Sequence, residues 1–162
     1  MTKLLEAQHR KVEAIFKKLE KGRLEAAPLL EELSNRLAAH MAIEQDIYYP
    51  GVKAVKEDLV LESYEEHSLA ELGLKRLLGT SPDSPSFAAR VTACKELVEH
   101  HVEEEEEELF PAVDRKVDAD VLAAMAKEMK ARFAEVEAAG FASAVPGGFA
   151  KTSADVSQKR AR

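Results

Sequence analysis

Apolar residues recur at intervals of three and four along most of the chain, which is the spacing of an amphipathic helix and not of a strand. Read together with capping and breaking residues, this spacing predicts five helices, over about residues 2–21, 25–47, 58–78, 86–108 and 118–139. Long helices joined by short loops are typical of an up-down-up-down bundle. We therefore expect an all-α fold, in which the fifth helix packs against a four-helix bundle.

Capping and breaking residues mark where these helices begin and end. Thr2 is the expected N-cap of the first helix, and Gly22 follows its last turn. Pro50 and Pro111 are expected to break the second and fourth helices, because proline lacks the amide proton that a helix interior needs. Gly140 is the expected C-cap of the last helix.

The end of the chain differs from the rest in composition. Residues 141–162 hold four basic residues and one acidic residue, so the formal charge of −7 for the whole chain leaves −10 for residues 1–140. We expect a single domain over 1–140, followed by a basic, poorly packed tail over 141–162 that is extended or disordered. As an alternative, the tail docks a protein partner, with Phe141 and Phe149 as its anchors. The acidic domain argues against a nucleic-acid partner.

Cysteine usage and hydropathy bear on the compartment. The single cysteine, Cys94, cannot form a disulfide within the chain, which fits a reducing environment. No apolar run follows Met1, and no stretch reaches the about 18 apolar residues that a membrane helix needs. We therefore expect a cytoplasmic protein without a membrane partner, in which Cys94 is a buried, inert thiol.

A duplicated pattern in the chain carries the candidate chemistry. Two His-x-x-x-Glu motifs lie 61 residues apart, and each histidine is followed ten residues later by the proline of an aromatic–proline pair. A further histidine precedes each motif, and these two histidines lie 58 residues apart. The six residues are His9, His40 and Glu44 in the first half, and His67, His101 and Glu105 in the second.

The spacing predicts where these side chains meet. Residues four apart lie on one face of a helix, and here that face is otherwise apolar, with Leu78 and Leu97 among its members. Four imidazoles and two carboxylates would therefore meet inside the bundle. A buried carboxylate costs several kcal/mol unless it is paired, whereas a metal ion uses both groups as ligands. The set predicts a pair of first-row ions, iron first, with manganese or zinc as alternatives.

Other polar residues near this face leave alternatives open. Glu13 and Glu71 each follow a candidate histidine by four residues, and either could ligate metal or accept a hydrogen bond from a ligand. Either could equally form an ion pair with Lys17 or Lys75, four residues further on. His100 lies one step off the inward face and is left out of the candidate set.

The acidic run over residues 103–108 and Tyr64 also permit ordinary structural interpretations. Tyr64 lies on the inward face one turn before His67, where it either packs in the core or donates a hydrogen bond near the site. Four glutamates of the acidic run are expected to form a solvated face, Glu103, Glu104, Glu106 and Glu107.

The duplicated pattern resembles the hemerythrin-like family, specifically its HHE cation-binding branch, over about residues 1–139. The resemblance implies a four-helix bundle around a non-haem di-iron centre, with imidazoles as terminal ligands. It also implies that Glu44 and Glu105 bridge the irons beside an oxo or hydroxo group. Glu71 stands where oxygen-carrying members have a second histidine on the third helix, so their five-histidine site is not evident here.

Two functions of different classes follow as hypotheses. In the first, the two irons bind or react with a small molecule, such as dioxygen, peroxide or nitric oxide, in sensing or detoxification, and weak peroxidase or catalase-like activity is one form of this. In the second, the domain is an iron-binding module for storage, iron sensing or partner assembly without catalysis. Metal would then stabilise the bundle, and the tail would dock the partner.

Overall fold

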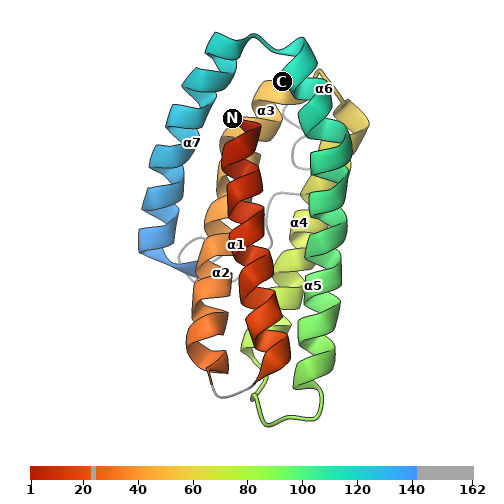
Figure 1. The fold of residues 1–162 in the computed structure, drawn as a ribbon, viewed down its shortest axis with the longest axis vertical. Coiled ribbons are helices and arrows are strands. Elements are labelled where there is room, and N and C mark those ends of the chain that lie inside the picture. The colour runs from red at the N-terminus through yellow and green to blue at the C-terminus, as the bar shows by residue number, and fades with distance from the viewer. Residues whose placement is uncertain (23–24, 142–162) are drawn as a thin grey trace, which may run out of the picture.

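The structure is a computed structural model that describes residues 1–22 and 25–141. Every regular element in this part of the chain is helical, which confirms the all-α prediction. In chain order the elements are α1 (Thr2–Lys21), α2 (Ala26–Ile43), the π-helical turn η1 (Glu44–Tyr48), α3 (Tyr49–Val52), α4 (Glu57–Leu78), α5 (Phe87–Glu104), the π-helical turn η2 (Glu105–Leu109), α6 (Phe110–Lys116) and α7 (Ala119–Ala139). The π turns join their neighbours without a break, so these elements form five long rods (Figure 1).

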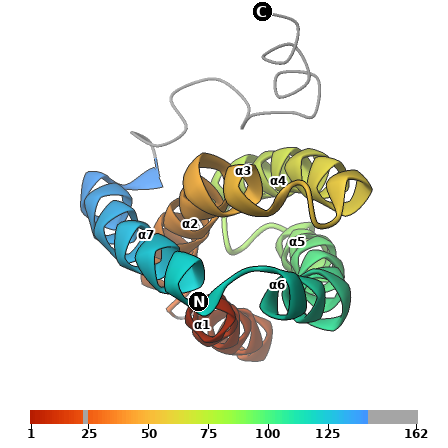
Figure 2. The same ribbon diagram turned by 90° about the horizontal axis from the view of Figure 1, so that it is seen from above.

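Four of the rods form the antiparallel bundle that the pattern predicts. Helix α1 packs against α2 and α5, and α4 packs against α5 and α2, which closes the ring of four (Figure 2). Helix α7 lies outside this ring, against α2 and η1. The core of the bundle is therefore shared by one face from each of α1, α2, α4 and α5.

The prediction that Pro50 and Pro111 break their helices is wrong. Each proline lies in the first turn of the α-helical segment that follows a π turn. A missing amide proton is tolerated there, because the hydrogen bonds of the π turn already shift the backbone register. The second rod therefore continues to Val52 and the fourth to Lys116, which lengthens both beyond the expected ends.

Two of the three cap predictions agree with the structure. Met1 takes the N-cap position instead of Thr2, whose hydroxyl donates a hydrogen bond to Asp114 of α6 at 3.1 Å. Helix α1 does end directly before Gly22, and Gly140 follows α7 with a φ of 79°, a conformation that glycine adopts at little cost. The expected tail, apart from Phe141, lies outside the described residues.

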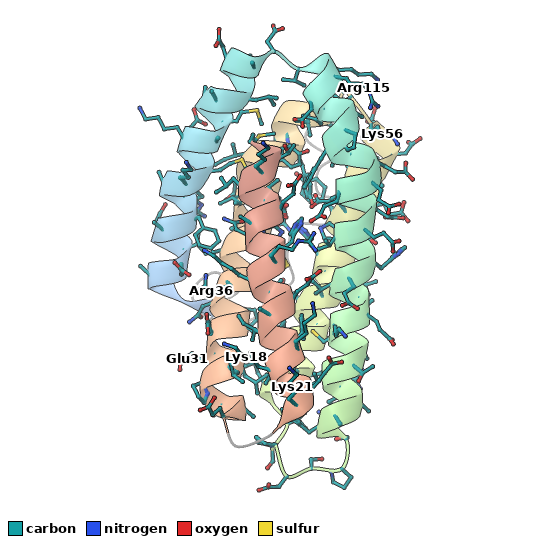
Figure 3. The ribbon with its side chains drawn as sticks, viewed as in Figure 1. Lys18, Lys21, Glu31, Arg36, Lys56 and Arg115 are labelled. Atoms are coloured by element: carbon teal, nitrogen blue, oxygen red, sulfur yellow. The ribbon has the colours of Figure 1, made fainter. Side chains whose placement is uncertain are left out.

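The core consists of two apolar clusters with a polar layer between them. The cluster toward the C-terminal end of α1, called the lower cluster, includes Val12, Phe16 and Leu33, and the cluster toward its N-terminal end, called the upper cluster, includes Leu5 and Tyr48. Along α1 the polar layer lies between Leu5 of the upper cluster and Val12 of the lower cluster. Figure 3 shows six charged side chains on the outside of the bundle, Lys18, Lys21, Glu31, Arg36, Lys56 and Arg115.

Two leucines predicted on the inward face are largely exposed. Leu78 and Leu97 are 39% and 40% exposed, while Leu77 and Val98, one position away, are buried. A single step moves a side chain about 100° around a helix, so an alternative neighbour of the same character can take the inward position. Cys94 is buried as expected, and burial raises the pKa of its thiol to about 12. None of the described helices is long and apolar enough to span a membrane.

Truncation of a core leucine tests this packing. Leu33 is 0% exposed in the lower cluster, so Leu33→Ala is expected to lower the free energy of unfolding by about 2–5 kcal/mol. Leu97→Ala is the matched control and is expected to change it by about 0.5 kcal/mol or less. Urea denaturation of both variants measures the difference. Equal losses at the two positions would contradict the assignment of the core.

Candidate metal centre

The polar layer brings together all six residues that the duplicated pattern singles out. Each bundle helix contributes one buried histidine, and the two glutamates at the start of the π turns are fully buried. Their ligand atoms form two groups, each within 4.8 Å, that share Glu44. One group is His9, His40, Glu44 and Glu105, and the other is Glu44, His67 and His101.

In the first group two imidazoles from α1 and α2 face one another. Nε2 of His9 lies 3.1 Å from Nε2 of His40. The nearest carboxylate oxygens are Oε2 of Glu44, 3.2 Å from His40, and Oε2 of Glu105, 3.5 Å from His9. Two ring nitrogens and two carboxylates therefore converge on one small volume.

The second group repeats this arrangement between α4 and α5. Nε2 of His67 lies 3.0 Å from Nε2 of His101. Oε2 of Glu44 is 3.3 Å from Nε2 of His67, and Oε2 of Glu105 is 3.7 Å from Nε2 of His101. Each glutamate thus lies close to one histidine of both pairs, which is the placement that a bridging carboxylate requires.

The hydrogen bonds on the far side of His9 and His40 identify their tautomers. Nδ1 of His9 lies 2.7 Å from a Glu106 carboxylate oxygen, and Nδ1 of His40 lies 2.9 Å from the side-chain carbonyl oxygen of Gln8. Both partners are acceptors, so each neutral ring carries its proton on Nδ1. The two Nε2 atoms then face each other with lone pairs, an arrangement that a cation stabilises.

Burial dominates the electrostatics of the layer. Burial, together with the neighbouring histidines, holds the pKa of His40 and of His67 well below the usual value. Burial raises the pKa of Glu44 well above its usual value, and the nearby Glu105 carboxylate adds to this shift. Burial lowers the pKa of His101, but Glu105 and Glu66 outweigh it and the net shift is upward.

Buried oxygens without partners show that the layer fits metal ions. Both carboxylate oxygens of Glu44, and Oε2 of Glu105, are buried and accept no hydrogen bond from the described residues. An unpaired buried carboxylate costs several kcal/mol, and a cation bound between the imidazoles would offset that cost. Neutral imidazole nitrogen and carboxylate oxygen are ligands for first-row metals, so the chemistry of the donor set agrees with the geometry.

Tyr49 joins the site, although the pattern assigns it only to an aromatic–proline pair. Its hydroxyl donates a hydrogen bond to Oε1 of Glu105 at 2.9 Å and lies 3.2 Å and 3.4 Å from Nε2 of His67 and His101. Its counterpart in the second half, Phe110, stacks on the ring of His9 at 5.9 Å. The two halves therefore place a hydroxyl at one end of the layer and a phenyl ring at the other.

The π turns explain how these aromatic residues reach the site. The backbone amide of Tyr49 donates to the carbonyl of Glu44, and that of Phe110 to Glu105, each five residues back. In an α-helix a residue five positions on is turned about 140° away, at about 100° per residue. The π turn brings it back above the glutamate. The aromatic–proline pair is the sequence signal that could have located both rings.

The alternatives at Glu13 and Glu71 resolve toward ion pairs. Glu71 is buried and bonds Lys75 at 2.5 Å, and Glu13 bonds Arg10 at 2.6 Å and Lys17 at 3.4 Å. Neither carboxylate belongs to the two groups of the layer.

Other residues near the layer take distinct positions. His100 is exposed and lies outside both groups, as expected. The hydroxyl of the buried Tyr64 donates to the backbone carbonyl of Gln45 at 3.1 Å. Among the acidic residues, Glu103 and Glu107 are exposed, but Glu106 is not the solvated residue expected, because the adjacent helix α1 presents His9 and Arg10 to it.

Two hollows border the histidines. A small cavity of about 20 Å³ lies inside the bundle, directly below the layer, and its lining includes all four histidines together with Leu37, Met41, Ala70 and Val98. A larger groove of about 410 Å³ runs between α1 and α5 and is lined by His9, Arg10, Phe16, Glu103 and Glu106, among others. The interior cavity offers room for about one water-sized molecule.

Comparison with known proteins places this geometry in a family. A crystal structure of a hemerythrin HHE cation-binding domain-containing protein from Mycobacterium kansasii, a homolog of Rv2633c, superposes with a TM-score of 0.76. The two chains are 26% identical, and the match covers 85% of this chain and 86% of that one.

Curated relatives match over parts of their length. A DNA nickase from Nostoc sp. is 26% identical over 137 residues, which are 83% of this chain and 39% of that protein. The uncharacterized protein Rv2633c of Mycobacterium tuberculosis is 29% identical over 84 residues, which are 52% of each chain. This chain therefore spans about two fifths to one half of these relatives.

The family model that matches describes the hemerythrin HHE cation-binding domain, and it covers residues 1–113. This range holds α1, α2, α4 and α5 with all six buried histidines and glutamates of the layer. By sequence, by fold and by its buried histidine–glutamate layer, the chain belongs to the hemerythrin family as an HHE cation-binding domain.

Proposed function

We propose that this domain holds two iron ions in the polar layer, and that the ions bind or react with a small molecule such as dioxygen, peroxide or nitric oxide. The observation that carries the proposal is the position of Glu44. Its carboxylate is fully buried, contacts one histidine of each pair, and has no hydrogen-bond donor among the described residues. Such a group is costly to bury unless cations occupy the space on its two sides.

The roles of the residues follow from the two groups. His9 and His40 would hold one ion, His67 and His101 the other, and Glu44 and Glu105 would bridge them. Iron would supply a change of oxidation state and a coordination position for the small molecule. Manganese or zinc would use the same ligands, so the identity of the metal is itself part of the proposal.

The surroundings of the layer favour a small ligand. The interior cavity beside the four histidines has a volume of about 20 Å³ and is lined mainly by apolar side chains besides the histidines. A diatomic molecule or peroxide is of this scale, whereas a larger substrate would have to separate the helices. This supports sensing or detoxification of a small molecule.

The nicking activity named for the Nostoc relative is not part of the proposal. This chain covers 39% of that protein. Residues 1–140 carry a formal charge of −10, which would repel a phosphate backbone. We propose no nucleic-acid or membrane partner for the domain.

A second candidate function is an iron-binding module for storage, iron sensing or partner assembly. The unpartnered oxygens of Glu44 and Glu105 favour it, because they make the metal-free bundle less stable than the loaded one. Occupancy by iron would then control the stability of the fold. The segment proposed for docking a protein partner lies, apart from Phe141, outside the described residues.

Metal content and optical spectra test the first proposal. We expect two irons per chain after purification without added chelator. We also expect the optical spectrum of the loaded protein to change with at least one of dioxygen, peroxide and nitric oxide, because the layer borders an interior cavity. Two irons without any spectral response would favour the module for storage or assembly. One zinc ion, or no metal, would contradict the di-iron assignment.

Replacing Glu44 with glutamine separates the energetic cost of burying the carboxylate from its role as a metal ligand. Glu44→Gln is expected to abolish binding of at least one iron, because an amide is a poor bridging ligand. In the metal-free protein the same change is expected to raise the free energy of unfolding by about 1–3 kcal/mol, since a buried carboxyl group without hydrogen-bond partners is replaced by an amide that never carries a charge. Metal analysis and urea denaturation, with and without iron, measure both effects.

Glu71→Gln is the matched control for this variant. Glu71 is equally buried and also stands four residues after a histidine, but its carboxylate bonds Lys75. We expect this variant to keep both irons. Loss of iron from Glu71→Gln would add Glu71 to the ligands, and full iron content in Glu44→Gln would refute the bridging role.

A further inference from the structure

Each histidine of the layer is held from behind by a side chain of an adjacent helix. Four such residues contact the Nδ1 atoms, and they come from the four sides of the bundle. A carboxylate oxygen of Glu106 lies 2.7 Å from Nδ1 of His9, and one of Glu66 lies 2.7 Å from Nδ1 of His101. The amide oxygen of Gln8 lies 2.9 Å from Nδ1 of His40, and the amide nitrogen of Gln45 lies 3.1 Å from Nδ1 of His67. We call these four residues the outer ring.

The outer ring runs in one direction around the bundle. Helix α1 supplies a partner to the histidine of α2, the second rod to that of α4, α4 to that of α5, and the fourth rod to that of α1. The contacts form a closed cycle around the ring of four rods whose arrangement Figure 2 shows. Each of the four rods of the bundle thus presents one histidine inward and one support sideways.

The sequence repeats this arrangement along with the histidines. Gln8 and Glu66 directly precede the histidines of α1 and α4, and they lie 58 residues apart. Gln45 and Glu106 directly follow the glutamates of the two motifs, and they lie 61 residues apart. These are the offsets of the duplicated pattern itself. The support is therefore built into both halves at matching positions.

The two kinds of support differ in charge. Each pair of facing histidines has one carboxylate partner, Glu106 or Glu66, and one amide partner, Gln8 or Gln45. The carboxylate contacts are the shorter ones, at 2.7 Å, as expected of charge-assisted hydrogen bonds. A carboxylate that accepts a hydrogen bond from Nδ1–H makes the opposite ring nitrogen, Nε2, more basic. The imidazole is then a stronger metal ligand than one whose Nδ1–H bonds a neutral amide.

We propose that the outer ring fixes the four Nε2 atoms toward the metal positions, and that it makes His9 and His101 stronger donors than His40 and His67. Each metal position then has one carboxylate-backed and one amide-backed imidazole. At the fourth position the structure places the amide nitrogen of Gln45 against Nδ1 of His67, and a half-turn about the last bond of the amide would present its oxygen to an Nδ1 proton instead. The inference rests on the proposed function, since it concerns the ligands of the same ions.

Burial accounts for the choice of residue at each place. Gln8 and Gln45 are 9% and 8% exposed, so a charge there would lack solvation. The Glu106 and Glu66 side chains are 24% and 14% exposed. Arg10 bonds both carboxylate oxygens of Glu106 at the edge of the groove between α1 and α5. Charge is thus used where water or an arginine can stabilise it.

The metal-free full chain provides the first test, through the tautomers of the histidines. Long-range proton–nitrogen NMR spectra are expected to show the His9 proton on Nδ1. Glu106→Ala should release this preference, and Glu106→Gln should keep it, because the amide oxygen also accepts the proton. A His9 tautomer that does not change in Glu106→Ala would overturn the positioning role. This readout needs no metal and holds even if the chain binds no iron.

The iron-loaded protein provides the second test. Glu106→Gln and Glu66→Gln should each raise the reduction potential of the iron, because a weaker imidazole donor stabilises the oxidised ion less. Glu106→Ala should weaken iron binding about 10–100-fold in a chelator competition. Glu107→Gln is the control, since it removes the same charge from an exposed neighbouring position. Equal shifts of potential in Glu106→Gln and Glu107→Gln would overturn the proposed difference between the donors.

Discussion

The central physical constraint on this structure is the burial of two carboxylates and four imidazoles in the middle of its core. These groups occupy a complete layer of the bundle, with apolar clusters above and below it. The energetic cost of such a layer is several kcal/mol for each unpaired charge, which the two apolar clusters must offset when no cation is bound. Stability and ligand chemistry are therefore linked through the same six side chains.

The layer exists because each helix carries its polar residues in a narrow window of an otherwise apolar face. Along α1 the inward residues change from Leu5 to His9 and back to Val12 within two turns. The π turns extend the layer upward, since the backbone shift after Glu44 and Glu105 turns the next aromatic residue over the site. The prolines that follow are compatible with this shift, and the rods continue beyond them.

Helix period and duplication were sufficient to predict the five rods and the convergence of the six side chains. They were insufficient where the outcome depends on contacts between helices. The solvated face assigned to Glu106 is wrong because His9 lies on an adjacent helix, which no spacing within one helix reveals. The prediction that Leu97 faces the core is wrong for a different reason. Val98 is equally apolar and lies about 100° around the helix from Leu97, so the sequence does not show which of the two side chains is buried. The π turns were not predicted, because a proline that follows a helical motif normally indicates the end of the helix.

Duplication makes the two ends of the layer similar without making them identical. The contacts of the outer ring are symmetric, since each histidine pair has one carboxylate and one amide partner. The aromatic covers are not, because Tyr49 brings a hydroxyl to His67 and His101 where Phe110 offers His9 a phenyl ring. The hydroxyl also donates to Glu105, so one of the two shared carboxylates is held and the other, Glu44, has no donor. The hydroxyl of Tyr49 is therefore one chemical difference between the two halves, because the repeat places the phenyl ring of Phe110 at the matching position.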